Sequence, residues 1–312
     1  MIHLKSIPFA TNKNVISSDP GAATLSETQA NGLINERQVT DAKLSATRQR
    51  PPDCLIIGVR KGGTRALLDS LALHPQIAVA RKEVHFFDRN ENFNRGKSWY
   101  KSQMPDSRPD QVVVEKTPAY FTNSQVPRRV LDFDPTLKII IIVRDPLLRL
   151  ISDFTQVYYT KMENNKTQIA LEEAIFRPNS TELKTSYKPV RNSLYSIHMR
   201  RWLEYFPLES FMIVDGDRFI QNPIGQLRLV EKFLGLPASI QQDQLVFNRG
   251  KGFYCFRNQR QRKPRCLGKS KGRKQIAVNA TVRKYLRQKL LPYTQEFFAQ
   301  IRTNFSSWLS LD

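Results

Sequence analysis

Short apolar segments alternate with helical patterns along most of this chain of 312 residues. Residues 54–59, 112–116, 138–143 and 211–215 are nearly continuous apolar runs, and each precedes a segment with helical spacing. This alternation predicts a parallel sheet, because parallel strands need long crossover connections. Strands that are apolar throughout predict helices on both faces, and such sheets bind ligands at the carboxyl ends of their strands. The sequence therefore predicts an α/β fold with its site at that edge.

The domain boundary is predicted near Pro51. Residues 1–50 are rich in Ser, Thr, Asn and Ala without a sustained period, which is typical of a flexible leader or stem. Residues 51–312 are predicted to form the folded domain, with further helices between residues 160 and 205 and a last one from about Thr281 to Phe298. The chain has no apolar run of about 18 residues and no convincing signal core, so we expect neither a membrane span nor a signal peptide.

The charge of the chain favours polyanionic partners. Its 49 Lys and Arg against 28 Asp and Glu give a net charge of +21. Such a field attracts polyanions and makes their binding sensitive to salt. Nucleic acid, an anionic membrane and a sulfated polysaccharide all fit this property. An apolar fraction of 40% is that of an ordinary globular protein and argues against general disorder.

Three cysteines leave the disulfide pattern open. Cys54 lies in the first apolar run, while Cys255 and Cys266 flank a basic loop and could form a disulfide. A disulfide would indicate an oxidising compartment, and four Asn-x-Ser/Thr sequons agree with a secretory glycoprotein. These sequons are at Asn165, Asn179, Asn279 and Asn304.

The first strand leads into a glycine turn that resembles a phosphate-binding loop. Gly58, Gly63 and Thr64 reproduce most of the pattern G-x-x-x-x-G-K-[ST], but Thr64 occupies the lysine position and Lys61 precedes the glycine pair. Free backbone N–H groups and the positive end of the following helix can bind an anion there. The alternative is a tight turn with solvated charges.

A second possible anion site follows the most apolar strand. Arg144 ends that strand, Asp145 is a plausible N-cap before Pro146, and Ser152 comes about two turns into the helix. The guanidinium of Arg144 could bind a phosphate in bidentate fashion. The alternative is that Arg144 forms an ion pair with Asp145 or Asp153. Anion sites at two strand ends suit a nucleotide that carries phosphates at both ends of its ribose.

Six motifs, in order and spacing, resemble those of the heparan sulfate glucosamine 3-O-sulfotransferases: GVRKGGTRALL, KEVHFFD, EKTPAYF, VRDPLLRLISDF, KGFYC and SKGR. The resemblance covers residues 51 to about 305. It implies a P-loop-like three-layer α/β domain that uses 3′-phosphoadenosine 5′-phosphosulfate as donor. The acceptor would be the 3-hydroxyl of glucosamine residues in heparan sulfate, and the location the Golgi lumen.

The resemblance also implies which residues bind the donor. The 5′-phosphosulfate would be held by Lys61, Gly62, Gly63, Thr64 and Arg65. The 3′-phosphate would be held by Arg144 and Ser152. A further donor-binding loop, braced by a Cys255–Cys266 disulfide, would contribute Tyr254, Lys271, Gly272 and Arg273. The chain departs from the family after this tract, because Gln275 stands where the family has a histidine, so the role of Gln275 is open.

Sulfuryl transfer needs a base and cations around an in-line displacement. As the resemblance implies, Glu83 would be the general base, with His85 on the same side if the segment is extended. Asp88 would help to orient the base or the acceptor. The cations would be Lys61 and Lys116, and Gln156 would contact the acceptor. The alternatives are that Glu83 pairs with Lys82 or Arg81 at the surface and that His85 is a packed core residue.

Three competing functions remain possible at this stage. A P-loop kinase or other nucleotide triphosphatase is disfavoured by Thr64 in the lysine position. A heparin- or nucleic-acid-binding protein without catalysis would bind polyanions but would have no donor pocket. Another heparan sulfate sulfotransferase, such as one for N-sulfation, would share the donor motifs. No metal is expected, because the His and Cys residues lack ligand spacing, and no nucleic-acid partner is expected. The oligomeric state is not predicted.

Overall fold

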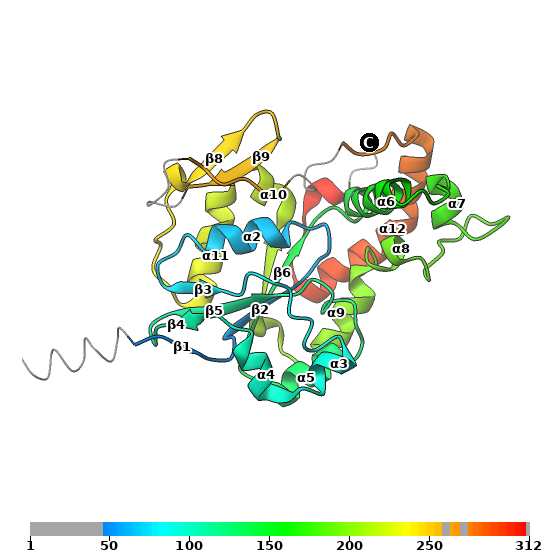
Figure 1. The fold of residues 1–312 in the computed structure, drawn as a ribbon. Coiled ribbons are helices and arrows are strands. Elements are labelled where there is room, and N and C mark those ends of the chain that lie inside the picture. Colours follow the sequence, from blue (N-terminus) through cyan, green and yellow to red (C-terminus); the bar gives the residue numbers. More distant parts are fainter. Residues whose placement is uncertain (1–45, 258–262, 269–273, 310–312) are drawn as a thin grey trace, which may run out of the picture. The chain divides into compact units, whose positions relative to one another are not determined.

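The computed structural model describes residues 46–257, 263–268 and 274–309. A five-stranded sheet forms its centre (Figure 1), in the order β3-β5-β2-β6-β7. All neighbouring strands in it are parallel. Their bounds are Ile77–Val79 (β3), Val112–Lys116 (β5), Cys54–Gly58 (β2), Lys138–Val143 (β6) and Phe211–Asp215 (β7). The parallel sheet is confirmed, with β3 as an additional short edge strand.

Helices cover both faces of this sheet (Figure 1). On one face, α2 and α11 pack against Ile56 and Ile140. On the other face, α4, α5 and α9 pack against Leu55, Ile57 and Ile139. The bounds are Thr64–Leu71 (α2), Gly96–Ser102 (α4), Val126–Phe133 (α5), Tyr195–Leu203 (α9) and Pro223–Leu234 (α11). The three-layer arrangement follows from strands that are apolar on both sides.

A third apolar cluster lies among helices next to the sheet. Buried side chains from α6, α7 and α8 pack there against the first half of the long helix α12. The bounds are Pro146–Glu163 (α6), Leu171–Ile175 (α7), Lys188–Arg191 (α8) and Ala280–Ile301 (α12). The second half of α12 packs against α9 and the main core. The expected helix at residues 281–298 is therefore present and slightly longer.

Several short elements complete the described part of the chain. The strands β1 and β4 pair antiparallel, as do β8 and β9. A disulfide joins Cys255 of β9 to Cys266, with an S–S distance of 2.03 Å, which confirms the braced C-terminal loop. The short helices α3 and α10 contribute residues to the cleft described below. The bounds are Arg48–Gln49 (β1), Asp106–Ser107 (β4), Leu245–Asn248 (β8), Phe253–Phe256 (β9), Asn90–Phe93 (α3) and Gly216–Gln221 (α10), with single turns at Leu208–Ser210, Gln242–Gln244 and Ser306–Trp308.

The boundary between a leader at residues 1–50 and a domain at residues 51–312 stays a prediction. The strand β1 begins at Arg48 and pairs with Ser107. None of the helices in the described ranges combines the length and the apolar composition needed to cross a membrane.

Candidate active site

A large open cleft lies at the carboxyl ends of β2, β5, β6 and β7, with a volume of about 1700 Å³. This exceeds the 300–1,000 Å³ that is usual for one small ligand, so the cleft has room for a nucleotide together with part of a larger molecule. The structure brings the following predicted site residues together on its walls: Lys61, Gly62, Gly63, Thr64, Arg65, Glu83, His85, Asp88, Lys116, Arg144, Ser152, Gln156 and Tyr254.

Residues 58–63, the glycine loop, connect β2 to α2. Val59 N donates to Ile142 O at 2.9 Å, and Gly62 N donates to Val59 O at 2.8 Å. A Cβ on Gly62 would lie 2.8 Å from Val59 Cγ2 and closer still to Ile142 O, so a larger residue does not fit. Gly63, the N-cap of α2, has a φ of 112° that disfavours other residues. The loop thus places the start of α2 at the cleft, which Gly63, Thr64 and Arg65 line, and an anion site requires such a helix N-terminus.

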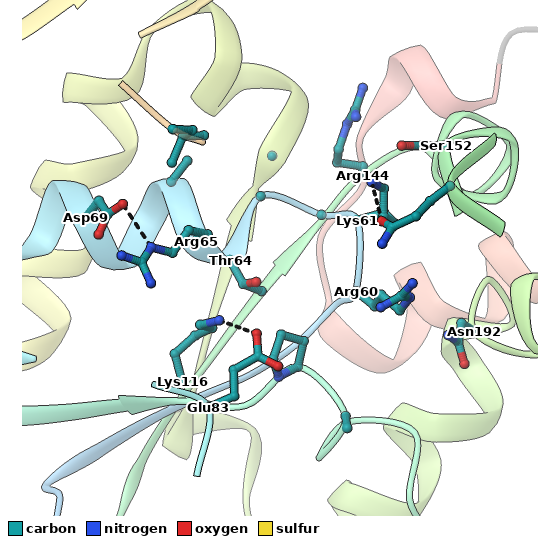
Figure 2. A pocket seen from close by; sticks show the side chains of 18 of the residues that line it. Arg60, Lys61, Thr64, Arg65, Asp69, Glu83, Lys116, Arg144, Ser152 and Asn192 are labelled. Carbon is teal, nitrogen blue, oxygen red and sulfur yellow. Dashed lines mark hydrogen bonds and ion pairs between the residues drawn. The ribbon is translucent and has the colours of Figure 1, made fainter. Parts of the chain in front are cut away.

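Arg65 in the first turn of α2 is fixed by protein contacts. Its Nε donates to Asp69 Oδ2 at 2.9 Å, and its Nη1 donates to Arg81 O at 3.0 Å. Arg81 in turn forms an ion pair with Asp69 at 3.1 Å. Asp69 of α2 therefore binds both Arg65, as Figure 2 shows, and Arg81, which lies two residues before Glu83. Because Arg81 pairs with Asp69, the sequence alternative in which it pairs with Glu83 is wrong.

The second predicted anion site is at the end of β6. Arg144 Nε donates to Asp217 Oδ1 at 3.0 Å, and Asp145 N donates to the other oxygen of Asp217 at 2.8 Å. The side chain of Asp145 caps α6, as predicted. The pairing of Arg144 with Asp145 or Asp153 is therefore wrong, because Asp217 holds the guanidinium in place. Ser152, which lies two turns into α6, lines the same cleft as Arg144, and Figure 2 labels both side chains.

Gly216 lets the glycine loop and Arg144 approach each other. This residue begins α10, directly after β7. A Cβ here would lie 2.6 Å from Val143 O, 2.7 Å from Gly62 O and 2.8 Å from Arg144 Cγ. Such distances are shorter than van der Waals contact, so only glycine fits between the glycine loop and Arg144.

Residues 83–88, the Glu83 segment, form the opposite wall of the cleft. Glu83 Oε1 forms an ion pair with Lys116 Nζ at the end of β5, and Figure 2 shows the two side chains pointing at each other. Glu83 Oε2 lies 3.5 Å from His85 Nε2, and His85 Nδ1 lies 2.9 Å from Asp88 Oδ2. The expected proximity of these groups is confirmed. The backbone is not extended at His85, which has a φ of 54°. The His85 ring packs against carboxylates rather than in the apolar core.

Lys61 lies between the glycine loop and helix α6. Its Nζ donates to Gln156 Oε1 at 3.1 Å. The structure thus brings together two residues for which the sequence predicted different ligands. Lys61 was expected to contact the sulfate donor, and Gln156 the sugar acceptor.

The C-terminal loops reach the same cleft. Tyr254 on β9 lines it, and its hydroxyl donates to Gln221 O at 3.4 Å. Gln275 also lines the cleft. The predicted tract of Lys271, Gly272 and Arg273 lies outside the described residues.

Several cleft residues were missed by the sequence analysis. Arg60 forms an ion pair with buried Asp153 at 2.9 Å, and Arg149 binds the same carboxylate at 2.8 Å. Burial raises the pKa of Asp153, but the two guanidiniums outweigh it and hold that pKa below its ordinary value. The walls from α8 and α9 add Lys188, Arg191, Asn192 and Arg201. Basic residues in two separate helices carry no local motif, so only the packing of α8 and α9 reveals them.

Among the described residues, no group of three or more His, Cys, Asp and Glu side chains is arranged to hold a metal ion.

Comparison with known families gives a match over most of the chain. Residues 51–304 match the family model described as "Sulfotransferase domain". The chain is 45% identical over 287 residues to human "Heparan sulfate glucosamine 3-O-sulfotransferase 5", which covers 89% of this chain and 81% of that protein. It is 39% identical over 259 residues to mouse "Heparan sulfate glucosamine 3-O-sulfotransferase 6", which covers 83% of this chain and 74% of that protein.

Solved structures agree on the fold. A sulfotransferase from Alicyclobacillus acidocaldarius superposes with a TM-score of 0.62 at 20% identity, covering 84% of this chain and 100% of that one. This similarity confirms the sulfotransferase fold.

Proposed function

Because this chain belongs to the heparan sulfate glucosamine 3-O-sulfotransferase family, we propose that it sulfates the 3-hydroxyl of glucosamine residues in heparan sulfate. The donor is 3′-phosphoadenosine 5′-phosphosulfate. One observation carries the proposal: the carboxylate of Glu83, paired with Lys116, shares one cleft with two anion sites at the ends of β2 and β6.

The two anion sites suit the two phosphate groups of the donor. The glycine loop and the first turn of α2 would hold the 5′-phosphosulfate through backbone N–H groups and through the side chains of Lys61, Thr64 and Arg65. Arg144, held by Asp217, would bind the 3′-phosphate together with Ser152. Both sites lie on adjacent strands, β2 and β6, so one nucleotide can reach both.

The C-terminal loop would complete the donor site. Tyr254 lies on β9, next to the disulfide at Cys255 that braces this part of the chain. The tract at residues 271–273 would add a lysine and an arginine. Gln275, which lines the cleft, would contact either substrate.

The transfer step follows from the Glu83 segment. Glu83 would accept the proton of the sugar 3-hydroxyl while the oxygen of that hydroxyl forms a bond to sulfur. The bond between sulfur and the 5′-phosphate oxygen breaks, and 3′-phosphoadenosine 5′-phosphate leaves. Lys61 and Lys116 would stabilise negative charge on the sulfuryl and leaving oxygens, a role that needs no metal. His85 and Asp88 would fix the direction of Glu83 through their contacts at 3.5 and 2.9 Å.

The acceptor is a polyanion, and the remaining walls of the cleft suit one. The basic side chains of Lys188, Arg191 and Arg201 line the cleft on the side of α8 and α9. Gln156 lies next to Lys61 and would contact the sugar near the transferred group. The net charge of +21 would attract the polymer at long range and make its binding sensitive to salt.

The position of the new sulfate tests this proposal. The protein is incubated with heparan sulfate and labelled donor, and the product is cleaved to disaccharides and mapped. We expect label at the 3-hydroxyl of glucosamine. Label at the amino nitrogen or the 6-hydroxyl would assign a different heparan sulfate specificity, and no label would contradict the proposal.

The Golgi lumen is the proposed place of action, since the Cys255–Cys266 disulfide favours an oxidising compartment. Microscopy of the tagged full-length protein against a Golgi marker checks this location. A cytosolic distribution would contradict it.

A further inference from the structure

Glu115 is a fully buried carboxylate directly behind the cleft. It lies on β5 beside Leu55 of β2 and has 0% of its surface exposed. The next residue, Lys116, faces the cleft and forms the ion pair with Glu83. Because successive strand residues point to opposite sides, Glu115 points away from Lys116, toward the core that contains Tyr100 and Tyr120.

Burial of this carboxylate is costly. It raises the pKa of Glu115 from 4.5 to about 7, and hydrogen bonds, that of Thr117 first among them, limit the rise. An apolar residue would fill the same space without this cost. Its contacts indicate what the carboxylate does.

The hydrogen bonds of Glu115 lead to the Glu83 segment. Thr117 Oγ1 donates to Glu115 Oε1 at 2.5 Å, and Val84 N lies 3.5 Å from the same oxygen. Tyr100 donates to Oε2 at 3.3 Å. The same hydroxyl of Thr117, which donates its hydrogen to Glu115, also accepts a hydrogen bond from His85 N at 3.3 Å.

Three consecutive amides of the segment are therefore held by side chains from β5 and the turn after it. Val84 N faces Glu115, His85 N faces Thr117, and Phe86 N donates to the hydroxyl of Tyr120 at 2.9 Å. No strand pairing supports these amides, and His85 has the unfavourable φ of 54°. Side-chain acceptors thus replace a strand ladder at the point where the chain must turn Glu83 toward the cleft.

We propose that Glu115 is a positioning residue for sulfuryl transfer. Its carboxylate, directly and through Thr117, fixes the backbone of residues 84–85 so that Glu83 stays opposite Lys116. Lys116 holds the side chain of Glu83 from the cleft, while Glu115 holds the backbone from the core. This inference rests on the proposed function, because it concerns the residue that accepts the proton.

Two pairs of variants of the full-length protein test the proposal. Glu115→Met removes both acceptor oxygens at similar volume, whereas Glu115→Gln keeps an acceptor for Thr117 and Val84. Thr117→Val removes the hydroxyl that links His85 to Glu115, whereas Thr117→Ser keeps it. The matched control is Glu231→Gln, which alters a buried carboxylate on α11 that binds the amides of Ser239 and Ile240.

The expected result is a split between kcat and the donor KM. Glu115→Met and Thr117→Val should each lower kcat by about 100-fold, as a shift of roughly 1 Å at a reacting group does. The donor KM should stay within about twofold, because the glycine loop and Arg144 are untouched, and Glu115→Gln and Thr117→Ser should retain most of kcat. Glu231→Gln should retain the kcat of the wild type.

Several outcomes would overturn the proposal. A wild-type kcat in Glu115→Met would do so. A parallel loss of kcat, donor affinity and Tm in that variant would also do so, because it would indicate a general destabilisation of the core. If Glu115→Met does not fold, the Thr117 pair decides, and equal kcat values in its two variants would count against the proposal. Absence of 3-O-sulfation in the wild type would instead contradict the proposed function.

Discussion

The glycine loop and the Glu83 segment line the same cleft, but they are held in place by different means. Close backbone packing restricts the glycine loop at Gly62, which lies too close to Ile142 O and Val59 for any side chain, and Arg60 and Lys61 add contacts to helix α6. Side chains fix the Glu83 segment, whose amides bind Glu115, Thr117 and Tyr120. The glycine loop, on the proposed donor side of the cleft, therefore depends on close backbone packing. The Glu83 segment, on the proposed catalytic side, depends on buried polar contacts. Changes on one side should affect donor binding, and changes on the other should affect transfer.

The largest expected effect is that of Glu83→Gln. The amide cannot accept the proton of the sugar hydroxyl, so kcat should fall by about a thousandfold. Transfer of labelled sulfate to heparan sulfate under saturating donor measures this. Glu172→Gln, on the exposed start of α7, is the control and should behave like wild type. Turnover within a few-fold of wild type in Glu83→Gln would contradict the assignment of Glu83 as the general base.

A smaller effect, on binding rather than transfer, is expected for Arg144→Ala. Loss of a charged hydrogen-bond donor should weaken donor affinity by about 10- to 100-fold. The analogue without a 3′-phosphate, adenosine 5′-phosphosulfate, should bind the variant and the wild type alike. Calorimetric titration with both ligands checks this. Arg218→Ala removes an exposed arginine on α10 and serves as the control. Equal weakening for both ligands would show that Arg144 does not contact the 3′-phosphate.

Gly216→Ala should weaken donor binding, because Gly216 lies between the glycine loop and Arg144. The added methyl group would collide with Gly62 O and Arg144 Cγ, and relief of such overpacking costs about 1–3 kcal/mol. Donor affinity should fall by about tenfold, with kcat at saturating donor nearly unchanged. In Gly225→Ala the nearest atom would lie at 3.4 Å, so this helix glycine is the matched control. Unchanged donor affinity in Gly216→Ala would mean that the two anion sites are not coupled through this contact.

The smallest effect concerns the pH dependence of stability. Burial raises the pKa of Glu115 from 4.5 to about 7, so the folded state keeps a proton that the unfolded state releases. The contribution of Glu115 to stability is therefore present at low pH and is lost as the pH rises through about 7. Relative to Glu115→Gln, wild type should lose about 1.4 kcal/mol of unfolding free energy between about pH 6 and pH 8. Urea unfolding of both proteins at the two pH values measures this, and a pH-independent difference would contradict a titrating Glu115.

The sequence predicts the donor side better than the catalytic side for a physical reason. A strand, a glycine turn and a helix are neighbours in the chain, so the anion site at residues 58–65 is visible as a local pattern. The same holds for Arg144 and the cap at Asp145. The partner of Arg144 was not predictable, because Asp217 follows β7 and meets Arg144 only through the order of the strands.

The catalytic side depends on contacts across the chain. Glu83 and Lys116 were both expected in the site, but their ion pair links residues 33 positions apart. Glu115 sits in an apolar strand pattern, where a buried carboxylate has no local signature. The short edge strand β3 and the β8–β9 hairpin were also missed, because runs of three or four residues carry little periodicity.

The separation of the two sides is tested most directly by donor binding to Glu83→Gln. The variant and the wild type are titrated with 3′-phosphoadenosine 5′-phosphate by calorimetry, on the same preparations used for transfer. The dissociation constants should agree within about twofold, although transfer is lost, because the glycine loop and Arg144 do not depend on Glu83. A dissociation constant weakened in parallel with transfer would show that the two walls form one interdependent site and would contradict this account.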